Sequence, residues 1–125
     1  MSKSKIESFE DLDVYRKLVK LHLEVHSITM SFPRFEMYEL GSQLRRSSNA
    51  VPANIAAGWN NKHMNMYLEG INRASGELRE TKHHVSIAFQ KGYIEQQQYD
   101  GVASRYDECG EMLRGLENSL ARFRP

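Results

Sequence analysis

The stretch QLRRSSNAVPANIAAGW, residues 43–59, decides how closely the helices of this chain can pack. It places Pro52 inside an apolar pattern typical of a helix and surrounds it with serine, asparagine and alanine. Proline lacks an N–H and clashes with the carbonyl four residues earlier, so we expect a helix that is kinked near Pro52. Ser47 and Ser48 can bond backbone carbonyls one turn back, and Asn49 or Asn54 can satisfy the groups that the proline frees. The small residues around them allow another backbone to come close.

Outward from this stretch, the chain reads as four helices, expected at about residues 11–31, 36–58, 60–91 and 95–123. In each, apolar residues recur every three or four positions and therefore share one face. The four stripes are Val14, Leu18, Leu21, Val25, Ile28 and Phe32; Met37, Leu40, Leu44, Val51 and Ile55; Met64, Tyr67, Ile71, Ala74, Leu78, Thr81, Val85 and Ala88; and Tyr99, Val102, Tyr106, Cys109, Leu113, Leu116, Leu120 and Phe123. Short connections favour an all-α, antiparallel up-down-up-down four-helix bundle. We predict a single domain over residues 1–125, with residues 1–10 as a flexible N-terminal segment.

Composition excludes several classes of protein. The formal net charge is +1 over 125 residues, so no overall electrostatic field imposes a nucleic-acid or membrane partner. Cys109 is the only cysteine, which excludes an intrachain disulfide and a cysteine-based zinc site, and we expect it to be a small core residue. The polar N-terminus lacks an apolar signal region, and no run approaches the ~20 apolar residues of a membrane span. A cytoplasmic location is the expectation.

The first expected helix carries a second stripe beside its core stripe. Its members are Leu12, Tyr15, Val19, His22 and His26. One explanation is a wide core face. The other is an interface between subunits, because an exposed apolar patch usually marks one. The spacing alone leaves both open.

Metal and catalytic motifs are incomplete. Glu80 and His83 have the Glu-x-x-His spacing of di-iron bundles, but that chemistry needs two such motifs, and this pair falls at outward positions of its helix. His22 and His26 stand four residues apart without an evident third ligand. No phosphate-binding loop and no nucleophile elbow occurs. We therefore expect no enzyme activity, no metal and no cofactor.

Basic residues gather on the second and third expected helices. The candidates for contacting phosphates are Arg45, Arg46, Arg73, Arg79 and Lys82. Arg45 and Arg46 lie outside the apolar stripe and are expected on the outer surface. A further basic group, including Arg114, lies toward the end of the last helix. Because Glu77 and Glu80 are interspersed, a mixed, solvated surface is the alternative.

Four segments together resemble a known family. Residues 43–59 resemble the pattern Q-L-R-R-A-x-x-S-I-P-x-N-I-A-E-G, and FPRFEMYEL, residues 32–40, resembles its lead-in. The opening SFEDLDVYRKLVKL and the segment YLEGINRASGELRET also match family patterns. The chain therefore resembles the bacterial four-helix-bundle proteins of 23S rRNA intervening sequences, often labelled S23 ribosomal protein. Ala57 stands where that family usually has Glu, and Glu77 where it usually has Ser.

This resemblance implies a ring-like homo-oligomer, a pentamer. The same fold resembles that of the accessory variability determinant proteins of diversity-generating retroelements, which bind RNA or DNA and a reverse transcriptase. The resemblance thus favours a non-enzymatic homo-oligomer that binds nucleic acid or a nucleoprotein partner. The alternative is a structural protein–protein adaptor without nucleic-acid affinity.

Overall fold

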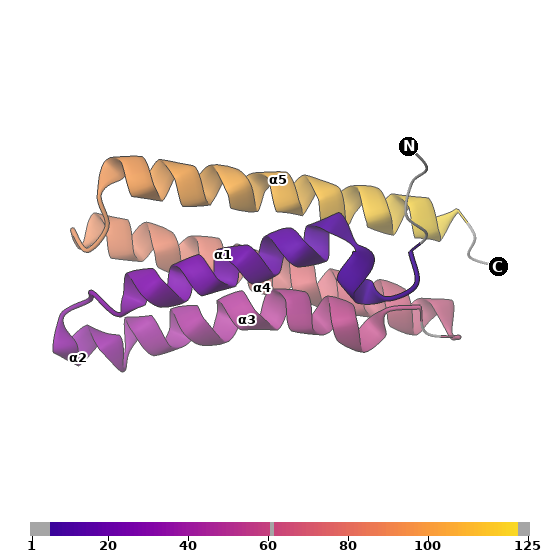
Figure 1. The fold of residues 1–125 in the computed structure, drawn as a ribbon, viewed down its shortest axis with the longest axis horizontal. Coiled ribbons are helices and arrows are strands. Elements are labelled where there is room, and N and C mark those ends of the chain that lie inside the picture. The colour runs from indigo at the N-terminus through magenta and orange to yellow at the C-terminus, as the bar shows by residue number, and fades with distance from the viewer. Residues whose placement is uncertain (1–5, 61, 123–125) are drawn as a thin grey trace.

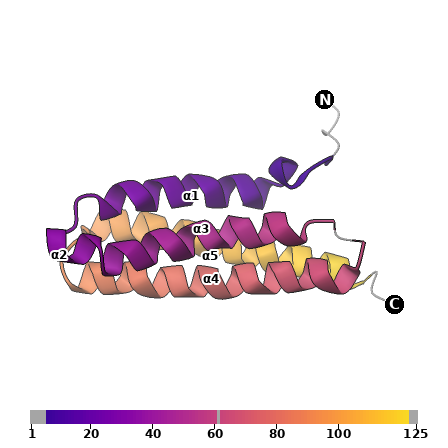
Figure 2. The same ribbon diagram turned by 90° about the horizontal axis from the view of Figure 1, so that it is seen from below.

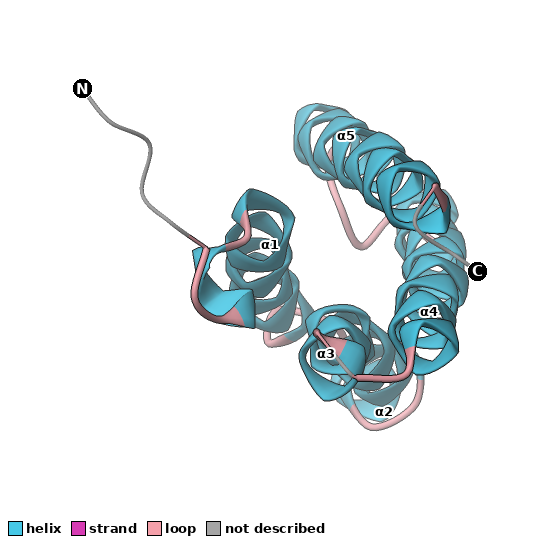
Figure 3. Cartoon of the chain, turned by 90° about the vertical axis from the view of Figure 1, so that its right-hand side faces the viewer, coloured by secondary structure: helices cyan, strands magenta, loops and turns pink. Residues whose placement is uncertain are grey.

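The computed structural model describes residues 6–60 and 62–122, and every regular element in this part of the chain is helical (Figure 1). The elements are η1 (Phe9–Asp11), α1 (Asp13–Thr29), α2 (Arg34–Met37), α3 (Leu40–Gly58), α4 (Met64–Gln90) and α5 (Gln96–Ala121). The four long helices run alternately in opposite directions along one axis (Figures 1 and 2). Seen end-on, they follow one another in the order α1, α3, α4, α5 (Figure 3). The predicted antiparallel bundle is confirmed.

The core forms where the four predicted stripes face one another. Leu18, Leu44, Ile71 and Leu113 are almost completely buried, one from each long helix. Cys109 is buried among them, as the sequence predicted. Leu116 and Leu120 are only partly buried, and Phe123 lies outside the described residues.

The most extensive helix–helix contact joins α3 to α4, and it depends on two glycines. A Cβ atom on Gly70 would lie 2.8 Å from the carbonyl oxygen of Asn54, and one on Gly58 would lie 3.0 Å from that of Met66. The first distance is shorter than real side chains tolerate, and the second is at the limit. The close approach predicted for the small-residue stretch therefore occurs, and it is centred on Gly58.

Pro52 lies inside α3, which continues on both sides of it. Ser47 and Ser48 donate side-chain hydrogen bonds to the carbonyls of Leu44 and Arg45, at 3.5 and 3.4 Å. The side-chain amide of Asn54 donates to the carbonyl of Ala50 at 2.8 Å. The predicted serine bonds are thus present, whereas the Asn54 amide bonds the Ala50 carbonyl and not the Ser48 carbonyl that Pro52 leaves without a donor.

Two helix boundaries differ from the sequence-based prediction. The helix predicted to begin near Glu36 is divided into α2 and α3, because the backbone leaves helical geometry at Glu39, where φ is −106° and ψ is −93°. The chain also turns before α1, where Ser8 and Asp11 cap η1 reciprocally. Of the N-terminal segment predicted over residues 1–10, the structure describes residues 6–10, and residues 1–5 lie outside the described residues.

None of the described helices combines the length and apolarity that crossing a bilayer requires.

Candidate nucleic-acid interface

Arg45 lies on the inner side of α3 rather than on its outer surface, contrary to the prediction. Its side chain is half-buried, and its guanidinium donates to Thr29 Oγ1 and to the carbonyl oxygen of Met37, each at 2.8 Å. The physical reason is that Met37 ends α2 and its carbonyl has no helical donor. Arg45 therefore joins α3 to the ends of α1 and α2, and its removal would disturb the fold.

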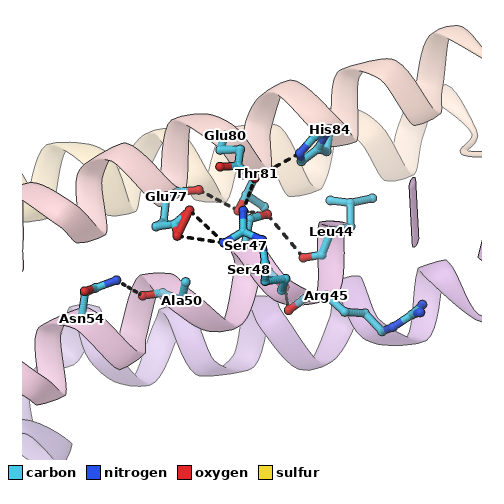
Figure 4. Close-up of polar contacts among 11 residues, drawn as sticks. Leu44, Arg45, Ser47, Ser48, Ala50, Asn54, Glu77, Glu80, Thr81 and His84 are labelled. Carbon is cyan, nitrogen blue, oxygen red and sulfur yellow. Dashed lines mark hydrogen bonds and ion pairs between the residues drawn. The ribbon is translucent and has the colours of Figure 1, made fainter. Parts of the chain in front are cut away.

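Arg46 is exposed but ion-paired with two glutamates of α4. Its guanidinium lies 3.1 Å from Glu77 and also contacts Glu80, whose carboxylate lies 3.2 Å from His84 Nε2. Figure 4 shows Glu77, Glu80 and His84 on α4, with the ion pairs and hydrogen bonds drawn as dashed lines. Burial opposes the ionisation of Glu80, but hydrogen bonds from Arg46 and His84 outweigh it and lower the pKa. Hydrogen bonds to Glu77 and Glu80 raise the pKa of Arg46.

The same position, Glu77, is where the sequence departs from the resembled family. The carboxylate that replaces the usual serine is one of the two that hold Arg46. In this chain, a phosphate would have to compete with Glu77 for that guanidinium.

Arg73 and Lys82 also have acidic partners. Arg73 lies 2.6 Å from Glu69 one turn earlier on α4, and Lys82 pairs with Asp107 of α5. Exposed ion pairs of this kind contribute about 0–1 kcal/mol. A phosphate can therefore displace the acidic partner at little cost.

Arg79 differs from the other four candidates. Among the described residues, no carboxylate lies within ion-pair distance of it, and its side chain is exposed. It lines a groove between α4 and α5 together with Arg114, which is also exposed and unpaired in the described part of the chain. Asn72 and Ser75 add hydrogen-bonding groups to the same wall, whereas Glu111 and Glu117 oppose anion binding. Both arginines stood out in the sequence, but no local pattern indicated that they share a groove.

Tyr106 lines this groove from inside the bundle. Its side chain is fully buried, and its hydroxyl has no hydrogen-bond partner among the described residues. Burial raises the pKa of Tyr106, so the hydroxyl stays protonated.

The second stripe on α1 divides between interior and surface. Leu12 is buried in the core of its own chain, and the ring of Tyr15 packs edge-on against Phe9 with centroids 4.9 Å apart. His22 Nδ1 lies 2.7 Å from Ser48 Oγ on α3. Val19 is half-buried and His26 is exposed. Part of the stripe therefore widens the core, and the remainder stays available to a partner.

The residues weighed as metal ligands have other contacts. Glu80 bonds Arg46 and His84, and His83 is exposed on the same helix. Within residues 6–60 and 62–122, no three histidine, cysteine or acidic side chains come together as a metal site would require. Burial raises the pKa of the Cys109 thiol to about 11, so it stays protonated at neutral pH.

A buried carboxylate, Glu36, was not singled out from the sequence. Its Oε2 accepts hydrogen bonds from Lys91 Nζ at 2.7 Å and from the Tyr93 hydroxyl at 2.9 Å. It thereby joins α2 to the connection between α4 and α5. These partners lie more than fifty positions away in sequence, so no local pattern could have indicated them.

Comparison with known proteins gives one family and one fold. The family model described as 23S rRNA-intervening sequence protein matches residues 10–115. A solved structure from Bacteroides thetaiotaomicron, a protein of unknown function from the S23 ribosomal protein family, is similar with a TM-score of 0.76 at 18% identity. The alignment covers 84% of this chain and 95% of that one. No curated protein sequence matches the chain.

Proposed function

The chain belongs to the 23S rRNA-intervening sequence protein family, and from this premise we propose that it is a non-enzymatic homo-oligomer that binds nucleic acid. The family description names a ribosomal RNA context and states no activity. The proposal therefore depends on the surface of this chain and on the groups it leaves available.

The observation that carries the proposal is the pair of unpaired arginines, Arg79 and Arg114, in the groove that the described parts of α4 and α5 form. A guanidinium can bind a phosphate through two parallel hydrogen bonds. Lys82 lies in the same groove and can exchange Asp107 for a phosphate, since the pair is exposed. Glu111 and Glu117 keep the groove from being strongly positive. We accordingly expect moderate affinity with a clear dependence on salt.

The other predicted contacts have secondary roles in this proposal. Arg46 and Arg73 lie on exposed faces of α3 and α4 and extend the basic surface once their glutamates are displaced. Arg45 keeps a structural role, because two of its donors are used within the chain.

The outer face of α1 supports assembly into an oligomer. Val19 and His26 reach this face, and Leu23 beside them is 61% exposed. An exposed apolar face of this kind is typical of a subunit interface. A pentamer is the subunit number that the family resemblance implies.

The test is binding of a structured ribosomal RNA fragment and of duplex DNA, measured by fluorescence anisotropy at several salt concentrations. Arg79→Gln with Arg114→Gln should weaken binding. It should also reduce the slope of log K against log salt by about 1 for each phosphate that is no longer neutralised. Arg16→Gln is the matched control for each of the single variants Arg79→Gln and Arg114→Gln, because it also removes one exposed arginine, here from α1, where Arg16 pairs with Asp13.

Equal weakening in the control and in the single groove variants, which lose the same one charge, would show that only total charge matters and would remove the groove from the proposal. An intact oligomer that binds neither RNA nor DNA at low salt would instead establish the adaptor alternative.

A further inference from the structure

Exposed apolar side chains are concentrated in one segment of the chain. Among the described residues, six large apolar side chains are more than half exposed, and four of them lie between residues 23 and 38. These four are Leu23, Met30, Phe35 and Tyr38. The segment comprises the second half of α1, the turn after it and α2, which lies at one end of the bundle (Figure 1). Such a concentration marks a contact surface for another macromolecule.

The aromatic part of this surface is held in a fixed position. Phe35 and Tyr38 are 70% and 72% exposed, yet the short helix that carries them is anchored on two sides. Glu36 between them is buried and bonded to Lys91 and Tyr93, and Arg45 bonds the carbonyl that ends α2. A backbone ordered before binding lowers the entropy cost of association. Two exposed rings on such a support form an anchor.

A hollow of matching chemistry lies between α1 and α5. The two apolar residues that line it, Leu21 and Cys109, belong to the core. Two ion pairs cross its rim, Lys17 with Glu108 and Arg105 with Glu24. Lys20 is the remaining cation of the rim, and no carboxylate in the described part of the chain lies within ion-pair distance of it. The hollow therefore suits an apolar or aromatic group that is followed by a carboxylate.

The end of α2 supplies an aromatic side chain and a carboxylate in adjacent positions, Tyr38 and Glu39. Glu39 follows Tyr38, is exposed, and makes no side-chain bond to any described residue. We propose that α2 of one copy docks into the α1–α5 hollow of a second copy, with Phe35 and Tyr38 over Leu21 and Cys109 and with Glu39 against Lys20. Anchor and hollow are different surfaces of one chain, so the contact is head-to-tail and can close a ring. The inference rests on the homo-oligomer of the proposed function, but it places the contact between subunits at α2 and the α1–α5 hollow instead of the outer face of α1.

Light scattering on size-exclusion-purified protein tests the contact. Phe35→Ala with Tyr38→Ala should convert the oligomer to monomer, and so should Lys20→Glu. Glu39→Lys should also dissociate it, whereas Glu39→Lys combined with Lys20→Glu should restore assembly through the reversed charge pair. Because these side chains stand on the surface and are not part of the core, circular dichroism should show unchanged helix content. Met66→Ala is the control, because Met66 is 52% exposed but lies in the first turn of α4, at the other end of the bundle.

Mixing two assembly-deficient variants tests the head-to-tail arrangement. The Phe35→Ala, Tyr38→Ala variant keeps its hollow, and the Lys20→Glu variant keeps its anchor. In the mixture, the intact anchor of the Lys20→Glu variant should dock into the intact hollow of the other variant and give a 1:1 dimer. The dimer should grow no further, because its remaining anchor and its remaining hollow both carry substitutions.

Three outcomes would overturn the inference while leaving the oligomer in place. They are an unchanged oligomer in the single variants, failure of the charge-reversed double variant to assemble, and no dimer in the mixture. A wild-type protein that is monomeric at all concentrations would instead overturn the oligomer of the proposed function, and this inference with it.

Discussion

Gly70 occupies a position where the backbone of α3 leaves no room for a side chain. A Cβ atom there would lie 2.8 Å from the Asn54 carbonyl oxygen and 3.2 Å from Gly58 Cα. Both atoms are backbone, so they cannot move without shifting a helix. We expect Gly70→Ala to lower the free energy of unfolding by about 1–3 kcal/mol, as overpacking does elsewhere. Urea unfolding followed by circular dichroism measures this.

Gly115 is the matched control for that substitution. It lies inside α5, and a Cβ atom added there meets nothing within 4 Å. Gly115→Ala should therefore stabilise the protein by about 0.5–1 kcal/mol, through helix propensity alone. Equal effects of the two substitutions would contradict the close approach of α3 and α4.

Glu36 should make stability depend on pH. Hydrogen bonds from Lys91 and then Tyr93 lower the pKa of this carboxyl from its ordinary 4.5. A carboxyl whose pKa is lower in the folded state stabilises the fold above the unfolded-state pKa. That contribution is lost as the pH falls through the folded-state value. Glu36→Gln should therefore lower Tm at neutral pH, and the difference from wild type should narrow as the solution is acidified.

The measurement is thermal unfolding at a series of pH values from about 7 to about 3. Glu111→Gln is the comparison, because Glu111 is exposed on α5, and it should show no such convergence. A Tm difference between Glu36→Gln and wild type that stays constant with pH would show that the ionised carboxylate does not hold α2 in place.

At the scale of elements, the heptad stripe of α4 is the strongest prediction that the structure confirms. Leu78 is 4% exposed, and Thr81 and Val85 are buried in the same row. Leu78→Ala should therefore cost about 2–5 kcal/mol, the range for truncating a buried leucine. The check is the unfolding free energy against that of Arg79→Ala, its exposed neighbour. A near-neutral Leu78→Ala would mean that the surrounding helices collapse into the space.

The boundary between α2 and α3 shows what an apolar stripe does not determine. Met37 and Leu40 fit one continuous stripe, yet the chain leaves helical geometry between them. The break is stabilised by Arg45 from within α3 and by Lys91 and Tyr93 from the distant connection between α4 and α5. Tertiary hydrogen bonds here outweigh local periodicity.

At the scale of the whole molecule, the four long helices do not pack equally. The contact between α3 and α4 is the most extensive, and the contact between α1 and α5 is the least extensive among neighbouring long helices. In the end-on view, the ribbons of α1 and α5 stand apart (Figure 3). The α1–α5 side is bridged by the pairs Lys17–Glu108 and Arg105–Glu24, all four side chains being substantially exposed. The bundle is therefore held chiefly by its core, and this side remains the one most open to a partner.

Replacing Glu24 by Gln tests that conclusion. The Arg105–Glu24 pair is bidentate but exposed, so its removal should change the unfolding free energy by less than about 1 kcal/mol, and less again at high salt. Chemical unfolding at low and high salt gives the answer. A destabilisation as large as that of Leu78→Ala would mean that ion pairs, rather than the core, hold α1 to α5.

The candidate site could be predicted only in part. Residue type gives the charge of a side chain, and its spacing from the apolar stripe gives the helix face on which it lies. The sequence was therefore enough to place Arg79 and Lys82 on the surface of α4. Whether a cation is available depends on carboxylates of other helices, such as Asp107 for Lys82 and Glu80 for Arg46. The distance between such a cation and a carboxylate of another helix is set only when the helices pack. The same dependence on packing explains why Arg45 was expected on the outer surface but lies half-buried.

The four long helices, their apolar faces and the small residues that bring α3 against α4 could be read from the amino-acid sequence. These follow from a repeat of 3.6 residues per turn and from side-chain size, which are local properties. Three features became evident from the packed structure alone. Carboxylates of other residues already pair with several of the basic side chains, the Glu36 carboxylate holds α2 in place, and Phe35 and Tyr38 are exposed on this fixed helix. Each of these depends on groups far apart in the chain, whose partnership is set by the packing of helices rather than by their order.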